Sequence, residues 1–176
     1  MPANPFNLEA LVDAYYRPLY RFAMSLTRAE ADASDMTQQT FAIWAAKGHQ
    51  LRDQSKVKTW LFTTLHREFL RTRREQRRRR HTELDDENGE LPFIEQATEQ
   101  RLDAASVLEA LERLGEAYHA PLSLFYLGEH SYQEIAEILE IPIGTVQSRI
   151  SRGKAELRML IEKDSVAAAT KWKQRG

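Results

Sequence analysis

Residues 131–158 constrain the fold of this chain more than any other stretch, because they read as two short helices separated by a tight turn. Ser131 can cap the first helix, and Glu134, three positions later, completes the sequence of a capping box. Pro142, which lacks a backbone donor, and Gly144, which can turn sharply, are expected to break the chain between the helices. The stretch therefore predicts a helix-turn-helix, around which the rest of the chain has to be arranged.

The second helix of this motif has two unlike faces, and Thr145 is its candidate cap. An apolar stripe faces inward and consists of Val146, Ile150, Leu157 and Ile161. The opposite face carries Gln147, Ser148, Ser151, Arg152, Ala155 and Arg158. Small, hydrogen-bonding and cationic side chains suit a helix that enters the major groove of DNA. The sequence therefore predicts that this face reads base edges.

Charge is distributed unevenly along the chain, although its formal net charge is only −1. Residues 66–81 hold eight arginines against two acids, whereas residues 82–100 hold seven acids and no lysine or arginine. So many arginines in one segment exceed what solubility requires, which favours phosphate binding. The nearby aromatic rings of Trp60, Phe62 and His66 could stack on unpaired bases. For Trp60 a place in the core is an equally good interpretation.

Helical periodicity dominates the remaining sequence, which indicates an all-α fold. The predicted helices cover residues 7–27, 33–47, 56–74 or beyond, 103–115 and about 122–127, with turns at 28–35 and 48–55. Asn7 is the expected cap of the first helix, and Pro18 should kink or split it. The chain contains no cysteine, which excludes disulfides and thiolate metal sites.

Two small helical domains joined by a flexible linker account for this pattern. The expected limits are 1–76 for the first domain, 77–102 for the linker, 103–163 for the second domain and 164–176 for a short basic tail. The linker has few apolar residues and no lasting period, so it should be flexible by itself. Asp85, Asp86 and Glu87 are consecutive acids, which do not converge on one point, so neither a metal site nor a cofactor is expected.

Motifs of catalysis and targeting do not occur in the sequence. There is no glycine-rich phosphate loop, no His-Glu-x-x-His pair and no nucleophile motif, and the five histidines share no ligand spacing. No apolar run approaches the roughly 20 residues of a membrane span, and the first residues do not resemble a signal peptide. We therefore expect a cytoplasmic protein that is not an enzyme.

Taken together, the two halves resemble the sigma-70 family of RNA polymerase sigma factors, in the short extracytoplasmic-function (ECF, group IV) type that keeps only domains two and four. The resemblance covers about residues 7–76 and 103–162. In the second half it is carried by residues 110–114, 122–139 and 141–154. In the first half, residues 32–44 resemble the family's clamp-binding helix and residues 58–62 the start of its promoter-melting helix.

This resemblance implies a function and two partners. A sigma factor binds core RNA polymerase, directs it to specific promoters and helps to open the DNA for transcription initiation. The residues that would face the clamp of the large polymerase subunit are Asp35, Gln38 and Gln39. From the pattern alone, Gln38 and Gln39 belong to a solvated face, so their role comes from the resemblance. An anti-sigma factor wedged between the domains is a further partner that the family implies.

The resemblance also implies two DNA-binding surfaces. The residues that would meet the −10 element are Ser55, Lys56, Lys58, Trp60, Arg67, Arg71, Arg73 and Arg74. The residues that align with −35 readout are Gln147, Ser148, Ser151 and Arg152, while Tyr132, Thr145 and Arg149 are placed for phosphates or local structure. Arg67 and Arg71 stand where the family usually has Asn and Asp, which leaves the identity of the flipped base open. The second domain would be a winged-helix-like sigma domain 4.

Two other classes of protein fit part of the sequence. A stand-alone regulator would combine the helix-turn-helix with a dimerisation or sensing domain and bind half-sites about one helical turn apart. An enzyme could carry the same motif as an appended DNA-binding module. Residues 32–44, together with the arginine-rich helix, favour the sigma factor because a simple repressor needs neither.

Overall fold

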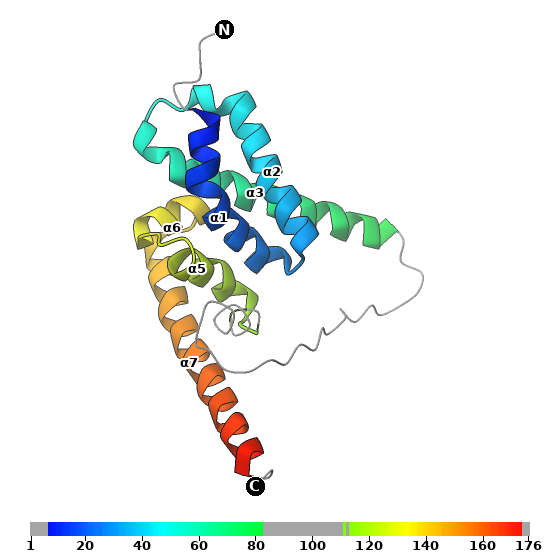
Figure 1. Cartoon of the computed structure of the whole chain (residues 1–176), viewed down its shortest axis with the longest axis vertical. Helices are drawn as coiled ribbons and strands as arrows, with labels where there is room; N and C mark the ends of the chain where they lie inside the picture. The colour runs from blue at the N-terminus through cyan, green and yellow to red at the C-terminus, as the bar shows by residue number, and fades with distance from the viewer. Residues whose placement is uncertain (1–6, 83–110, 112, 174–176) are drawn as a thin grey trace.

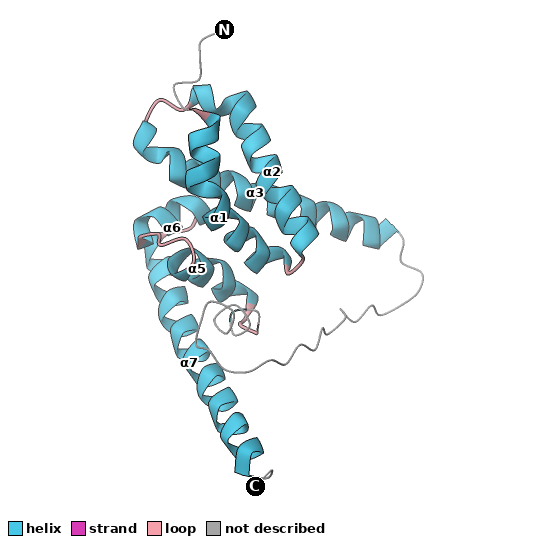
Figure 2. Ribbon diagram, viewed as in Figure 1, coloured by secondary structure: helices cyan, strands magenta, loops and turns pink. Residues whose placement is uncertain are grey.

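The computed structural model describes residues 7–82, 111 and 113–173 of the chain. This described part consists of α-helices, two short 3-10 helices and loops, and it contains no strand (Figure 2). The predicted all-α class is therefore confirmed. The acidic cluster at 85–87 and most of the helix expected over 103–115 lie outside the described residues.

Three helices form the first group: α1 (Leu8–Thr27), α2 (Glu30–Lys47) and α3 (Val57–Thr82) (Figure 1). Each packs against the other two, and their facing sides bury Leu19, Phe22, Trp44, Leu61, Phe62 and Leu65 completely. This apolar contact holds the group together, because burying one large side chain contributes about 1.5–3 kcal/mol.

The ends of α1 and α2 differ in part from the sequence prediction. Asn7 caps α1 as expected, since its Oδ1 accepts the backbone N–H of Glu9 at 3.1 Å. Pro18 lies inside α1, which runs on without being split. The turn predicted at 28–35 is wrong in length, because α2 already begins at Glu30. Arg28 makes the turn in the left-handed region at φ 58°, so two residues are enough to reverse the chain.

A second group is formed by α5 (Glu116–Tyr126), α6 (Tyr132–Leu139) and α7 (Ile143–Lys173). The capping box at the start of α6 is confirmed. The Ser131 Oγ accepts the N–H of Glu134 at 3.2 Å, and the Glu134 carboxylate accepts the N–H of Ser131 at 2.7 Å. Both terminal donors are therefore satisfied by side chains.

The turn between α6 and α7 is made by a residue that the sequence does not single out. Glu140 adopts the left-handed conformation at φ 56°, and its backbone N–H donates a hydrogen bond to the Ala136 carbonyl. Gly144, expected at the break, lies inside α7 without a positive φ. The prediction of Thr145 as a cap is also wrong, because α7 begins earlier and the N–H of Thr145 bonds to the Pro142 carbonyl.

Helix α3 and helix α7 both run into segments that the sequence assigned to the linker and to the tail, although α3 was expected to reach Arg74 or beyond. Helix α3 continues to Thr82, so the first residues of the expected flexible linker are helical. Helix α7 continues to Lys173, through most of the expected tail. Arginine has a high helix propensity, which favours the continuation of α3 through its arginine-rich end.

The two groups pack against each other. Helix α3 contacts α6, and α1 contacts α5. The buried apolar side chains of both groups belong to one cluster, while the second half of α7 extends away from it (Figure 1).

Candidate nucleic-acid and polymerase interfaces

The start of α3 is shaped by an aspartate cap. Asp53 precedes the 3-10 helix Gln54–Lys56, and its Oδ1 accepts the Ser55 hydroxyl at 2.7 Å and the Ser55 N–H at 2.9 Å. These two bonds hold the pKa of Asp53 below its usual value. The cap presents Ser55 and Lys56, two of the predicted −10 residues, on the surface.

Trp60 takes an intermediate position between core and surface. Its ring meets the buried ring of Trp44 edge-on, with centroids 5.0 Å apart and planes at 78°. Trp60 is only half-buried, so part of its surface remains accessible. Trp60 can therefore be both a core residue and a stacking residue, because one part of its ring packs on Trp44 while the accessible part can meet a base.

The arginines of α3 are in unlike surroundings. Arg71 donates to Glu68 at 2.7 Å and to Glu75 at 2.9 Å on its own helix, and these bonds raise its pKa. Arg73 lies over the Phe69 ring at 5.6 Å. Arg74 is exposed, and together with Leu70, Arg73 and Arg77 it lines a shallow surface hollow.

The predicted −35 residues lie on α7 as the sequence pattern expected. Gln147, Ser148, Ser151 and Arg152 are exposed, and Val146, Ile150 and Leu157 are buried on the opposite side. Ser148 donates its hydroxyl to the Thr145 carbonyl at 3.0 Å, so toward DNA it has only acceptor capacity left in this rotamer. Arg149, Thr145 and Tyr132 are half-buried, and the Tyr132 ring packs on Phe125.

A glycine in α7 sets how closely this helix approaches α5. A Cβ at Gly153 would lie 2.5 Å from Leu122 Cδ1 and 3.0 Å from Tyr118 Cβ, both on α5. Only the absence of a side chain permits this close approach. Gly153 is thus a positioning residue that the sequence pattern did not single out.

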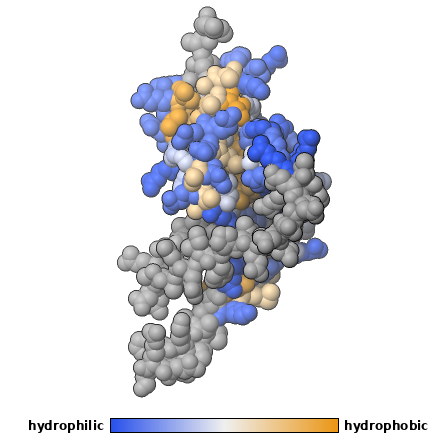
Figure 3. Space-filling model, turned by 90° about the vertical axis from the view of Figure 1, so that its right-hand side faces the viewer, coloured by the Kyte–Doolittle hydropathy of each residue, from blue (hydrophilic) through white to orange (hydrophobic). Residues whose placement is uncertain are grey.

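The predicted polymerase-binding residues lie on the outer side of α2. Asp35, Gln38 and Gln39 are exposed, while Ala33, Thr37, Thr40, Phe41 and Trp44 turn inward. Gln38 Nε2 donates to the Ser34 hydroxyl at 3.2 Å, which orients its amide along the helix. On the coloured part of the surface in Figure 3, hydrophilic residues surround a smaller number of hydrophobic ones.

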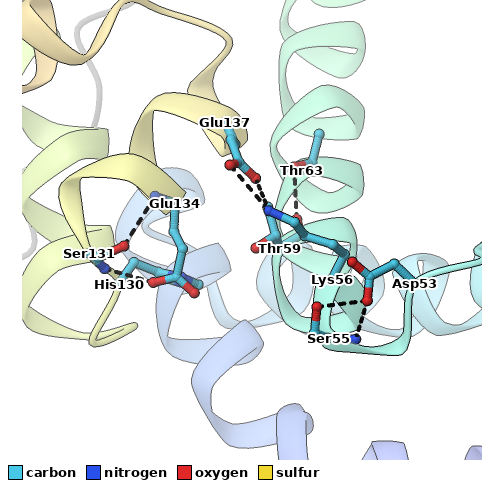
Figure 4. A network of polar contacts seen from close by, with 9 residues as sticks. All are labelled: Asp53, Ser55, Lys56, Thr59, Thr63, His130, Ser131, Glu134 and Glu137. Atoms are coloured by element: carbon cyan, nitrogen blue, oxygen red, sulfur yellow. Dashed lines mark hydrogen bonds and ion pairs between the residues drawn. The ribbon is translucent and has the colours of Figure 1, made fainter.

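The structure brings one predicted surface into contact with residues that sequence reasoning missed. Lys56 Nζ lies 2.9 Å from Glu137 Oε2, and Arg67 Nε lies 3.1 Å from Glu140 Oε1 (Figure 4 shows the first pair). The glutamates belong to α6 and to its C-cap, in the second group of helices. More than seventy residues separate the partners in sequence, so no local spacing could have indicated these pairs.

Among the described residues no group of three or more His, Asp or Glu side chains could hold a metal ion. A search of the same residues finds no helix long and apolar enough to cross a membrane.

Comparison with known proteins accounts for both groups of helices. The family model for sigma-70 region 2 matches residues 11–79, and the model for sigma-70 region 4 matches residues 104–157. The chain belongs to the sigma-70 family. As a sigma factor it binds RNA polymerase and directs it to promoters.

Similar proteins point to the ECF type. The RNA polymerase sigma factor YlaC of Bacillus subtilis is 29% identical over 157 residues, which cover 86% of this sigma factor and 90% of YlaC. The ECF sigma factor SigE of Mycolicibacterium smegmatis is 31% identical over 166 residues, covering 92% of this chain and 64% of SigE. The ECF class expected from the sequence is therefore confirmed.

Two solved structures share the fold. The sigma factor RpoE from Bartonella quintana, in complex with the anti-sigma factor NepR, superposes with a TM-score of 0.73 at 29% identity, covering 88% of this chain and 96% of RpoE. CnrH, solved with the cytosolic domain of CnrY, gives 0.65 at 23% identity, covering 89% of this chain and 88% of CnrH. The second likeness extends to the fold alone.

Proposed function

We propose that this sigma factor divides its work among three helices. The exposed face of α2 binds the polymerase clamp, α3 meets the −10 element during melting, and α7 reads the −35 element. The observation that carries this division is the placement of the three candidate sets. The α2 and α7 sets are exposed opposite a buried stripe of the same helix. The −10 set is exposed or half-buried along α3 and the 3-10 helix before it.

The −10 role of α3 follows from its side chains. Lysine and arginine at its first turns and along its length can neutralise phosphates, while Trp60 offers part of a ring for stacking. Unstacking a base costs a few kcal/mol, and contacts of this kind offset that cost. In this proposal Arg74 and Lys58 contact the strands directly, and Arg71 orders the helix surface through Glu68 and Glu75.

The functional units are residues 1–76 and 103–163, with 77–102 as the connection between them and 164–176 as a basic tail. The first unit supplies clamp binding and melting, and the second supplies upstream recognition. The protein has no chemistry of its own, because nucleotide addition belongs to the polymerase, and it acts in the cytoplasm where the polymerase works. An anti-sigma factor is included among its partners because the similar RpoE of Bartonella quintana was solved with one.

A binding experiment tests the polymerase-binding part. The purified chain is mixed with core RNA polymerase and passed over a sizing column, alone and as the Asp35→Ala/Gln38→Ala/Gln39→Ala variant. We expect the unchanged chain to co-elute with the polymerase and the variant to elute free. The matched control is Glu9→Ala/Asp13→Ala, which changes exposed side chains of α1. Co-elution of the triple variant at wild-type level would remove α2 from the proposal.

Transcript mapping tests the promoter-reading part. After overexpression of the sigma factor, the start sites of induced transcripts are aligned, and we expect two shared upstream elements. Transcription from these sites should fall for the Arg152→Ala variant. Induced transcripts without any shared upstream element would contradict promoter reading by this protein.

A further inference from the structure

A cluster of aromatic rings lies where α5, α6 and α7 pack together, and the Phe125 ring near the end of α5 is its centre. The ring of Tyr126 meets it edge-on, with centroids 5.1 Å apart. The ring of Tyr132, the first residue of α6, lies against it with centroids 5.7 Å apart. Phe125 is half-buried, and Tyr126 is 43% exposed. The cluster therefore reaches the surface beside the start of α6.

Lys154 of α7 places its ammonium on this cluster. The Nζ atom lies 4.2 Å from the centroid of the Phe125 ring and 5.9 Å from that of the Tyr126 ring. The face of an aromatic ring attracts a cation at such distances. Within the described part of the chain, no carboxylate forms an ion pair with Lys154. The rings therefore hold the ammonium in place without a counter-charge.

Lys154 borders the exposed face of α7 that is assigned to the −35 element. It follows Ser151 by three residues and precedes Arg158 by four, the spacings at which helical side chains are neighbours. Lys154 is half-buried, as is Arg149 on the other border of the same face. A helix in the major groove of DNA has a sugar-phosphate strand on each side. Both borders of the face are therefore placed to meet phosphates.

The same ring contacts a residue of the first helix of the motif. In a helix-turn-helix this first helix crosses the DNA backbone, and Tyr132 opens it here. Tyr132 and Lys154 both pack on Phe125. One ring thus sets the placement of a border residue from each of the two helices.

The ring contact prepares the lysine for an anion. A lysine side chain loses much conformational freedom when it is fixed, and a side chain that is already restricted loses less on binding. The ammonium has three donors, and an aromatic face uses none of them as a full hydrogen bond. Phosphate oxygens accept charge-assisted hydrogen bonds from such a group, so they add to the ring contact and do not have to replace it.

We propose that Lys154 binds a backbone phosphate of the −35 duplex and that Phe125 is the positioning residue that holds its ammonium for this contact. The inference rests on the proposed role of α7 in −35 binding. It adds a contact that carries no sequence information to the residues that read bases. Such a contact fixes the register of α7 on the duplex.

A DNA titration tests the phosphate contact. The full chain and its Lys154→Gln variant are titrated into fluorescein-labelled duplexes with the mapped −35 element or a scrambled sequence, at several salt concentrations. We expect Lys154→Gln to weaken binding to both duplexes about tenfold at low salt and to lower the salt slope by about 1 unit. A slope equal to that of the unchanged chain would overturn the proposal.

The matched control for this titration is Lys47→Gln. It removes the same charge from an exposed position at the end of α2. Its affinity for both duplexes should stay within about twofold of the unchanged chain. An equal loss in Lys47→Gln and Lys154→Gln would show a general charge effect and would also overturn the proposal.

A double-mutant cycle tests the role of Phe125. Phe125→Leu keeps an apolar side chain but removes the ring face, so it should weaken duplex binding about two- to fivefold. In the Lys154→Gln background the same change should have little effect, because the ammonium that the ring holds is gone. Phe125→Tyr keeps the ring and should bind like the unchanged chain. Equal losses in both backgrounds would assign Phe125 to the structure alone and refute its positioning role.

The outcomes separate this inference from the function on which it rests. A wild-type chain that binds both duplexes equally, while Lys154→Gln still lowers the slope, would contradict −35 reading and leave the phosphate contact standing. Unchanged DNA binding by Lys154→Gln, together with its failure to co-elute with core polymerase, would assign Lys154 to a protein partner and overturn the inference. A chain that binds neither duplex would overturn both.

Discussion

Single side chains decide whether a predicted contact residue is free to bind. Arg152 is exposed on the outward face of α7, whereas Arg71 is already hydrogen-bonded to two acids of its own helix. The sequence presents both as arginines on a helix. Their surroundings differ because Glu68 and Glu75 lie three and four positions from Arg71, the spacing at which helical neighbours meet.

We expect Arg152→Ala to weaken recognition of the −35 element by about 1–3 kcal/mol, the discrimination of one bidentate base contact. The measurement is a titration of duplex DNA that carries either the mapped −35 element or a scrambled sequence. The loss should appear on the specific duplex and be small on the scrambled one. An equal loss on both would show that Arg152 touches only phosphate.

Replacing Arg73 and Arg74 with alanine should flatten the salt dependence of promoter binding. Each arginine that neutralises a phosphate is expected to account for about 1 unit of the slope. The slope is read from the affinity at several salt concentrations, with Arg17→Ala/Arg21→Ala as the control because these exposed arginines lie on α1. A slope unchanged from the wild type would place Arg73 and Arg74 away from DNA.

The helices were readable from the sequence where local chemistry fixes their ends. The capping box of Ser131 and Glu134 was predicted and is present, because its partners lie within one turn. The turn at Glu140 was missed because a glutamate with positive φ is uncommon and carries no turn signal. The sequence predicted the turn at Gly144 instead, although Gly144 lies within α7 and has no positive φ.

Two glycines of α7 should respond oppositely to alanine. Nothing lies within 4 Å of a Cβ at Gly144, so Gly144→Ala should raise the free energy of unfolding by about 0.5–1 kcal/mol. A Cβ at Gly153 would meet Leu122 and Tyr118 at 2.5 and 3.0 Å. Gly153→Ala should therefore lower that free energy by about 1–3 kcal/mol, since the buried Leu122 side chain and the Tyr118 Cβ must shift. Urea unfolding checks both, and equal effects would contradict the close packing of α5 on α7.

Two histidines near the contact between α3 and α6, the half-buried His66 and the buried His130, have a lowered pKa. Burial lowers the pKa of His66 to about 4, while Glu140 opposes the shift. Burial, and then the charge of Lys58, lowers the pKa of His130 to about 4 against the opposing charge of Glu134. Both imidazoles are neutral in the folded protein near neutral pH. In acid, each can gain a proton only by disturbing its buried surroundings.

Stability should therefore fall on acidification between about pH 6.5 and 4. In this window the unfolded chain binds more protons than the folded one, so the free energy of unfolding rises with pH. A shift of the pKa of His130 from 6.5 to about 4 corresponds to at most about 3 kcal/mol of stability. This stability is fully present above the unfolded pKa and is lost as the pH falls toward the folded pKa. Urea unfolding at several pH values checks this. His130→Phe should reduce the loss, and the exposed His49→Gln should not.

The sequence by itself determined the all-α class, the helix-turn-helix with its capping box and the outward faces of α2 and α7. These features depend on periodicity and on contacts within one helical turn, which the order of residues fixes directly. Only the tertiary structure decided that the cations at the start of α3 meet Glu137 and Glu140, and that Phe62 packs on His130. Such pairs join segments far apart in the chain, and they form only when the surfaces of the two groups of helices fit together.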